Sequence, residues 1–334
     1  MTNSDQPLQT KDGLPVFRLG YGTLTLAKSQ KNLAVSAAAD LFSYAFERGI
    51  KWFDTAELYD NYEQLARFLK ETSGQPFIST KSYAFDRKGL NASLDAARRR
   101  LGVETIDLFM LHEQVDKKTL AGHREAFKAL LDAKEKGIVR YVGVSTHAVS
   151  VVTSIADEVS LKASLDPDFD TSIYRHTDVL FPLLSQSGYG LLDGTASEMA
   201  KAAAEAAKTG ITVLGMKLFG GGHLLYKREA VVADALSQSF VSAWSVGMGS
   251  ISEIETNLAW FKGETPDRRW LDASAALPRR LQVTDDCTRC GRCVARCNSG
   301  AMRLGAYTAV SDPEKCTLCS YCASVCEDMA IKIF

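Results

Sequence analysis

The sequence predicts an α/β fold, a (β/α)8 TIM barrel followed by a small cysteine-rich domain. The chain has 334 residues, and a barrel alone uses roughly 250, so the length suits a barrel with an appendage. From about residue 17 to residue 262, short apolar runs alternate with amphipathic helical stretches. All eight cysteines lie at or beyond Cys287. The predicted domains are therefore residues 1–262 for the barrel, 263–281 for a linker and 282–334 for the cysteine-rich domain.

Eight short apolar runs are the candidate strands of the barrel. They span residues 17–22, 51–54, 77–81, 106–112, 139–145, 169–174, 211–216 and 243–247. Helical patterns between them cover residues 35–48, 61–71, 90–101, 122–136 and 195–209. Glycine follows several of these helical stretches just before the next strand, which is typical of helix ends. An open doubly wound sheet is the alternative, but its G-x-G-x-x-G turn after the first strand is missing.

Four polar residues end separate predicted strands: Asp54, Lys81, His112 and Ser145. The carboxyl ends of barrel strands converge on the face where active sites form. A single such residue is usually a helix cap or a solvated turn, but four on one sheet are hard to explain as caps. The sequence therefore predicts a polar site at this face.

Composition excludes several classes of partner. The formal net charge is −1, which gives no electrostatic reason to expect nucleic acid or an anionic membrane. Residues 1–13 are polar and do not resemble a signal peptide. No uninterrupted apolar stretch approaches the roughly 20 residues that cross a bilayer. We expect a cytoplasmic protein that acts on a small molecule.

The cysteines form two copies of the pattern C-x2-C-x2-C-x3-C. The first copy is Cys287, Cys290, Cys293 and Cys297, and the second is Cys316, Cys319, Cys322 and Cys326. Three closely spaced thiolates can bind three irons of a cubane cluster, whereas the fourth cysteine is too far along the chain to complete the same cube. Zinc is the alternative, usually held by two C-x2-C pairs. The duplicated triplets favour two 4Fe-4S clusters.

This spacing resembles that of bacterial two-cluster ferredoxins, in which the fourth cysteine of each run binds the other cluster. The resemblance implies one cluster on Cys287, Cys290, Cys293 and Cys326, and a second on Cys316, Cys319, Cys322 and Cys297. The proline that usually follows the fourth cysteine is replaced by Asn298 and Glu327. The departure concerns the local loops and the cluster potential rather than ligation.

The barrel segment resembles the aldo-keto reductase family. Residues 53–59 (FDTAELY) look like the family motif in which an Asp and a Tyr five residues later are catalytic. Residues 79–81 (STK) look like its catalytic-lysine strand, and residues 111–113 (LHE) like its histidine. Residues 143–147 and 14–23 match its loop after the fifth strand and its opening hairpin. The whole chain is similar to bacterial members that end in a two-cluster ferredoxin domain.

The resemblance implies roles for four residues. Tyr59 would donate a proton to a substrate carbonyl, and Lys81 would lower the pKa of Tyr59 from its ordinary value of about 10. Asp54 would keep Lys81 charged and oriented. His112 would hydrogen-bond the carbonyl oxygen.

The resemblance also implies contacts to a nicotinamide cofactor. Ser145 would lie near the carboxamide. The residues near the diphosphate would be Lys217, Gly220, Gly221 and Gly222. Those at the adenosine end would be Gly249, Ser250, Glu253 and Asn257. Residues 247–257 contain two acids and no base, so we expect NADH to be preferred to NADPH.

The two halves raise a question of electron number, because a nicotinamide exchanges two electrons and each cluster passes one. A flavin could mediate, but no flavin motif is evident. Three readings stay open: an aldo-keto reductase with coupled clusters, an electron-transfer reductase whose clusters feed the barrel, and a non-catalytic electron carrier. In the first two readings, an external electron carrier is a possible partner that exchanges electrons with the clusters. Since the cysteine-rich domain takes the chain position of the family's C-terminal substrate loop, we expect it to cover the barrel mouth.

Overall fold

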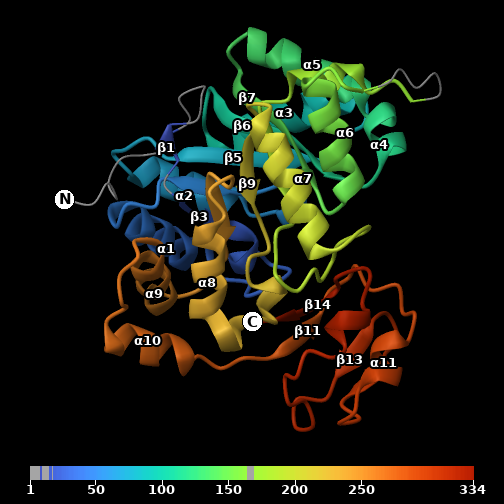
Figure 1. The fold of residues 1–334 in the computed structure, drawn as a ribbon. Coiled ribbons are helices and arrows are strands. Elements are labelled where there is room, and N and C mark those ends of the chain that lie inside the picture. The colour runs from blue at the N-terminus through green and yellow to red at the C-terminus, as the bar shows by residue number, and fades with distance from the viewer. Residues whose placement is uncertain (1–7, 10–14, 17, 164–168) are drawn as a thin grey trace.

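A computed structural model describes residues 8–9, 15–16, 18–163 and 169–334. Eight parallel strands close into a barrel in the order β10-β3-β4-β5-β6-β7-β8-β9, with helices around it (Figure 1). The strands are β3 (Leu19–Gly22), β4 (Trp52–Asp54), β5 (Phe77–Ser82), β6 (Ile106–Gln114), β7 (Val139–Thr146), β8 (Val179–Pro182), β9 (Thr212–Gly215) and β10 (Ala243–Val246). Before the barrel, β1 (Leu8–Gln9) and β2 (Pro15–Val16) pair antiparallel. The predicted barrel is confirmed.

The helices follow the amphipathic stretches of the sequence. They are α1 (Val35–Glu47), α2 (Tyr62–Glu71), α3 (Arg87–Leu101), α4 (Lys117–Gly122), α5 (Arg124–Glu135), α6 (Val149–Val159), α7 (Ala196–Lys208), α8 (Arg228–Ser237) and α9 (Ile251–Phe261). Side chains cap several of them at the N-terminus, as Asp86 does for α3. Among the described residues, every helix is too short or too polar to cross a bilayer.

The sixth strand was predicted at the wrong place. The predicted strand covered residues 169–174, but a 3-10 helix, η3 (Ser172–His176), begins within that range. The sixth barrel strand is β8, which follows it. All four residues of β8 are buried, as a parallel strand covered on both faces requires. Tyr174, which suggested a strand, instead packs on Phe127 at 4.6 Å between ring centroids and donates its hydroxyl to Leu120 O at 2.7 Å. Residue 17 of the first predicted strand lies outside the described residues.

Bulky side chains fill the barrel interior. Those packed there are Trp52, Phe77, Leu108, Met110, Val179, Phe181, Leu214, Met216 and Ala243. A larger core lies between the strands and the surrounding helices. Since the interior is packed, chemistry has room only at the barrel's ends.

The range predicted as a linker is largely ordered structure. It contains α10 (Arg268–Ala275), whose Leu271 packs against the barrel's outer core. Leu281 already belongs to β11 (Leu281–Val283), which pairs antiparallel with β14 (Ile331–Ile333). Between them lie α11 (Arg292–Arg296), the paired strands β12 (Met302–Leu304) and β13 (Ala309–Ser311), and η6 (Ala323–Val325). We call residues 281–334 the cysteine module.

The cysteine module lies against the carboxyl end of the barrel strands (Figure 1). Strand β14 contacts η4 (Gly220–Gly222), the loop after β9. A Cβ added at Gly222 would meet Ile333 O at 1.9 Å, so only glycine permits this approach. His223 bonds the module with both ring nitrogens, to Ser320 Oγ at 2.8 Å and to Ile331 O at 2.9 Å. The predicted position over the barrel mouth is confirmed.

Candidate active site at the barrel mouth

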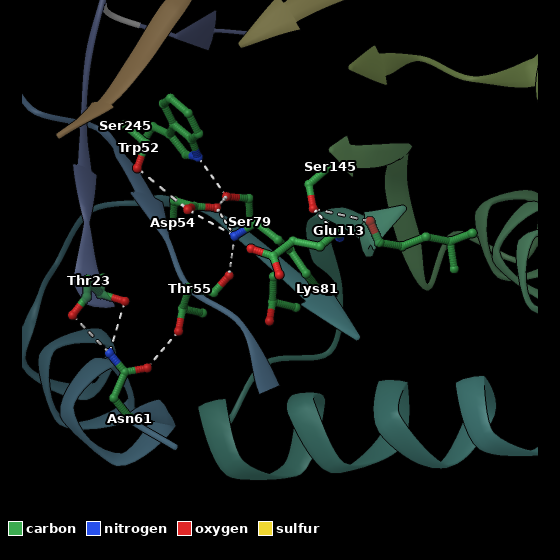
Figure 2. Close-up of polar contacts among 12 residues, drawn as sticks. Thr23, Trp52, Asp54, Thr55, Asn61, Ser79, Lys81, Glu113, Ser145 and Ser245 are labelled. Atoms are coloured by element: carbon green, nitrogen blue, oxygen red, sulfur yellow. Dashed lines mark hydrogen bonds and ion pairs between the residues drawn. The ribbon is translucent and has the colours of Figure 1, made fainter. Parts of the chain in front are cut away.

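A buried ion pair occupies the ends of β4 and β5. Lys81 Nζ lies 2.8 and 2.9 Å from the two carboxylate oxygens of Asp54 and donates a third hydrogen bond to Thr55 O at 2.7 Å (Figure 2). The two side chains are 1% and 6% exposed. Burial lowers the pKa of Lys81, and the Asp54 carboxylate opposes that shift. All three ammonium protons are therefore engaged.

Neutral side chains hold this pair in place. Ser79 Oγ donates to Asp54 at 2.6 Å and in turn accepts from Trp52 Nε1 at 2.8 Å (Figure 2). Asn61 joins two loops at the rim, accepting from Thr55 Oγ1 at 2.6 Å and donating to Thr23 Oγ1 at 2.9 Å. The pair thus sits in a saturated polar network with fixed geometry.

Tyr59 stands above the ion pair on η2 (Glu57–Tyr59). Its ring centroid is 5.3 Å from Lys81 Nζ and 5.8 Å from the ring of His112. Burial raises the pKa of Tyr59 well above 10, and the carboxylates of Asp54 and Glu113 add to that shift. In this structure burial outweighs any lowering of this pKa by Lys81, whose ammonium is hydrogen-bonded to Asp54 and Thr55, and the role of Lys81 toward Tyr59 stays a prediction. Tyr59 is a neutral hydroxyl donor.

His112, on β6, is neutral as well. Burial, assisted by the charge of Lys81, lowers its pKa to about 3. Its Nδ1 is buried and has no hydrogen-bond partner among the described residues. Its ring stacks on Tyr83 at 4.3 Å between centroids. A neutral imidazole can donate one hydrogen bond from its protonated nitrogen.

Sequence reasoning missed three polar neighbours of the site, Tyr83, Glu113 and His147. Tyr83 donates its hydroxyl to Glu113, and His147 Nε2 lies 3.4 Å from the other Glu113 oxygen. Burial lowers the pKa of His147 to about 4, so it is neutral at pH 7. Two of the three could have been found from their position in the sequence. Glu113 directly follows His112, and His147 lies two residues after Ser145, at strand ends already predicted to form the site.

Ser145 does not reach the mouth cavity. Its Oγ accepts a hydrogen bond from Glu113 N at 2.8 Å (Figure 2), and the side chain is fully buried. The residue organises the backbone after His112 in this structure.

A cavity of about 160 Å³ opens beside Tyr59, between the barrel and the cysteine module. Barrel residues lining it include Asp54, Tyr59, Lys217, Gly221, Gly222, Ser245 and Glu253. The cysteine module contributes Lys332, Ile333 and Phe334. We call it the mouth cavity. Of the predicted catalytic residues, Asp54 and Tyr59 line it, whereas Lys81 and His112 are not part of its lining. Of the predicted diphosphate residues, Lys217, Gly221 and Gly222 line it, while Gly220 is buried beside Ser187.

The residues predicted for the adenosine end are engaged within the protein. Ser250 Oγ caps α9 by accepting from Glu253 N at 3.2 Å, and Glu253 pairs with Arg279 at 2.8 Å. Asn257 donates to Glu253 O at 2.9 Å. Two bases from elsewhere in the chain, Arg279 and Lys31, also line the mouth cavity. A Cβ added at Gly249 would lie 2.6 Å from Lys31 Cε.

Four cysteines surround one void inside the cysteine module. They are Cys287, Cys290, Cys293 and Cys326, the first quartet that the ferredoxin resemblance implies. Hydrogen bonds reach the sulfurs from Ala309 N, 3.4 Å from Cys287 Sγ, and from Arg292 Nε, 3.3 Å from Cys290 Sγ. Such donors stabilise thiolates and tune cluster potentials. The residues therefore fit a four-iron cluster.

The second implied quartet is Cys316, Cys319, Cys322 and Cys297. Burial, together with neighbouring Cys316 and Cys319, raises the pKa of the free Cys322 thiol to about 12. Cys297 packs in the same small core as Cys322. Because that core also contains Cys287, Cys293 and Cys326, the second implied quartet stays a prediction.

Comparison with known proteins gives two family matches. The model described as "Aldo/keto reductase family" matches residues 18–239, more than half of the chain. The model described as "4Fe-4S binding domain" matches residues 309–332, which contain the second cysteine run.

Curated relatives and a solved structure agree. An aldo-keto reductase of Mycolicibacterium vanbaalenii is 28% identical over 73% of this chain and 78% of its own length. Methylglyoxal reductase DkgA of Yersinia pestis is 26% identical over 48% of this chain and 56% of its own length, so the chain spans little more than half of that relative. The crystal structure of PA4992, a putative aldo-keto reductase from "Pseudomona aeruginosa", superposes with a TM-score of 0.61 at 21% identity, covering 76% of this chain and 94% of its own. This chain is therefore a member of the aldo/keto reductase family that carries a C-terminal 4Fe-4S binding domain.

Proposed function

We propose that this oxidoreductase reduces a carbonyl compound with NAD(P)H, or oxidises the alcohol in reverse, at Tyr59. The observation that carries the proposal is the placement of two neutral hydrogen-bond donors, Tyr59 and His112, above the buried pair of Lys81 and Asp54. A carbonyl oxygen that gains negative charge needs donors of this kind. The pair fixes the position of the donors without competing for the substrate's oxygen.

A bound nicotinamide supplies or accepts the hydride in this chemistry. The protein residues do the rest: Tyr59 passes its proton to the forming alkoxide, and His112 holds the oxygen. The raised pKa of Tyr59 makes it a weak acid, so proton transfer is favourable only as charge develops on the substrate oxygen. Residues 332–334 of the cysteine module cover part of the mouth cavity, which would limit the access of water to the reacting centre.

The mouth cavity contains residues predicted for catalysis, for the diphosphate and for the adenosine end: Tyr59, Lys217, Gly222 and Glu253. Its volume of about 160 Å³ is below the roughly 300–1,000 Å³ of most small-molecule sites. Binding of a whole dinucleotide therefore requires the roof formed by residues 332–334 to move outward.

The preference for NADH over NADPH stays a prediction. The prediction was based on residues 247–257, which contain two acidic residues, Glu253 and Glu255, and no basic residue. Glu255 is now seen to pair with Arg48 at 2.7 Å, and Glu253 with Arg279. Lys31 and Arg279 bring positive charge to the same end of the cavity, which counts against the premise. Titration of the holoprotein with each nucleotide gives the two dissociation constants and decides the preference.

We further propose that the module holds two four-iron clusters with the crossed ligation given above. Two clusters can together deliver or store the two electrons that a nicotinamide exchanges. An external electron carrier would then load them one electron at a time.

A second function, a reductase in which the clusters feed a substrate or flavin in the barrel, is favoured by one observation. Ala330 and Ile331 line the void around Cys326, while the next residues of β14, Lys332 and Ile333, line the mouth cavity. A single strand therefore separates the cluster site from the barrel's pocket. The position of the first cluster suits electron transfer into the barrel.

The test uses protein purified without oxygen and with full iron content. We expect NAD(P)H-dependent reduction of small aldehydes by the wild type and loss of most of it in Tyr59→Phe, with nucleotide binding kept, because only a transition-state contact is removed. Tyr307→Phe, at an 89% exposed tyrosine, is the control and should be fully active. Full activity of Tyr59→Phe would refute the proposed role. NADH-driven bleaching of the clusters without aldehyde reduction would favour the second function.

A further inference from the structure

Two lysines from different domains line the mouth cavity. Lys217 follows β9 of the barrel, and Lys332 lies in the middle of β14 of the cysteine module. Lys332 crosses directly over the glycine loop: a Cβ added at Gly221 would lie 3.1 Å from its Cδ and 3.8 Å from its Nζ. Both lysines therefore belong to the wall of one cavity.

Neither lysine has a carboxylate to pair with. Among the residues that the structure describes, no Asp or Glu oxygen lies within ion-pair distance of either ammonium. Lys332 is only 6% exposed, and its Nζ donates to a backbone carbonyl, Met329 O. Burial lowers the pKa of Lys332 well below its ordinary value, and the charge of Lys217 acts in the same direction. A buried charge that lacks a partner is costly, so buried lysines are normally paired.

Two acids, Asp286 and Glu113, act on the charge of Lys332 from beyond ion-pair distance, and both have other partners. Asp286 accepts from Thr284 Oγ1 at 2.8 Å. Glu113 accepts from the hydroxyl of Tyr83 and lies 3.4 Å from His147. The exposed Lys315 of the same module, in contrast, has Asp312 at 3.6 Å. Lys332 thus differs from Lys315 in being buried at the cavity without a carboxylate beside it.

The backbone at Lys217 supports a functional reading. Its φ of +61° is in the left-handed region, which is unfavourable for a residue with a side chain. Such strain persists where the surrounding structure imposes it, and it is concentrated at functional sites. Three glycines with positive φ follow within five residues, so the loop as a whole is shaped for a close approach.

We propose that Lys217 and Lys332 together form a site for an oxyanion, a phosphate or a carboxylate, which the barrel cannot complete without the cysteine module. The inference deepens the proposed function, because the site lies beside Tyr59. The anion comes from one of two sources, the diphosphate of the nucleotide or a carboxylate on the carbonyl substrate. In either case, the module contributes a binding residue to the barrel's chemistry.

The experiment measures anion binding without turnover. Oxygen-free holoprotein is titrated calorimetrically with inorganic pyrophosphate and, separately, with oxalate. We expect Lys332→Met and Lys217→Met each to weaken binding of at least one probe about ten- to hundredfold, the usual effect of removing one charge-assisted hydrogen bond. Lys332→Arg keeps the charge and should bind nearly as well as the wild type. Lys315→Met is the matched control on the same module and should change nothing.

The two probes separate the sources. Weakened pyrophosphate binding in Lys332→Met assigns the site to the nucleotide, and weakened oxalate binding alone assigns it to the substrate. Iron content and the visible spectrum of each variant show whether its clusters are intact. Two outcomes overturn the proposal: no anion binding by the wild type, or unchanged binding of both probes in Lys332→Met with its clusters intact. Because no turnover is measured, an enzyme inactive toward every carbonyl would refute the proposed function and leave this test unaffected.

Discussion

Replacing Asp54 with asparagine isolates the ion pair at the base of the site. Asparagine has the same shape and can keep its contacts to Ser79 and Ser245, so packing is preserved. What is lost is the negative charge facing Lys81, whose side chain is 1% exposed. Removing one partner of a buried pair costs about 3–5 kcal/mol, because the remaining charge is left unpaired.

The expected change in melting temperature follows from that cost. A barrel of about 260 residues unfolds with an entropy of roughly 0.55 kcal/mol per kelvin, so a loss of about 3 kcal/mol lowers the Tm by about 5 °C. The pKa of Lys81 is already lowered in the folded protein, so the unfolded chain binds more protons at alkaline pH. The penalty of Asp54→Asn should therefore shrink as the pH rises toward 10, where Lys81 loses its charge in both proteins.

Thermal unfolding followed by circular dichroism at pH 7 and at pH 9.5 measures both effects. The control is Glu205→Gln, which removes a surface pair with Lys208 at 2.6 Å. That pair is exposed to solvent, so the control should leave the Tm nearly unchanged. A variant of Asp54 that melts within about 1 °C of the wild type at pH 7 would contradict the reasoning.

Three further outcomes are expected. Burial lowers the pKa of His147 to about 4, so below pH 6.5 the unfolded chain binds a proton that the folded protein does not, and the free energy of unfolding falls. In urea unfolding, His147→Gln should lose about 2 kcal/mol less stability than the wild type between pH 7 and pH 5. An identical loss in the two proteins would count against this reasoning. Iron analysis of Cys326→Ala should find about four iron atoms rather than about eight, with the cluster of the first run damaged; damage confined to the second run would contradict crossed ligation. Gly222→Ala, where a Cβ would meet Ile333 O at 1.9 Å, should speed hydrogen exchange in β14, whereas Gly263→Ala, with a similar positive φ and nothing within 4 Å, should not; equal exchange in the two variants would refute the contact.

The barrel could be predicted because its strands end on recognisable residues. Asp54, Lys81 and His112 close strands whose apolar runs are short and bounded by glycine or helix. The sixth strand could not be placed in the same way, because the apolar alternation around Tyr174 imitates a strand. Only tertiary packing on Phe127 and Leu120 gives that tyrosine its buried position in a 3-10 helix.

The candidate site was predicted in part for a related reason. Local sequence motifs predict Tyr59 and Lys81 as catalytic residues, and the regular spacing of the cysteines predicts them as cluster ligands. Nothing local shows that Lys332 would face Lys217, 115 positions earlier in the numbering, or that Arg279 would pair with Glu253. The direction of the pKa shift at Tyr59 could not be predicted from the sequence either, because it depends mainly on how deeply the side chain is buried.

The position of β14 ties maturation of the enzyme to iron supply. This strand pairs with β11 within the cysteine module and at the same time forms part of the wall of the mouth cavity. A small domain whose core includes its cysteines gains much of its folding free energy from the metal that they bind. We expect the barrel to fold around its own large core and its pocket to stay uncovered until the clusters are inserted. A cell short of iron, or exposed to oxygen that destroys clusters, would thus accumulate barrels that are folded and yet open to water at the reacting centre.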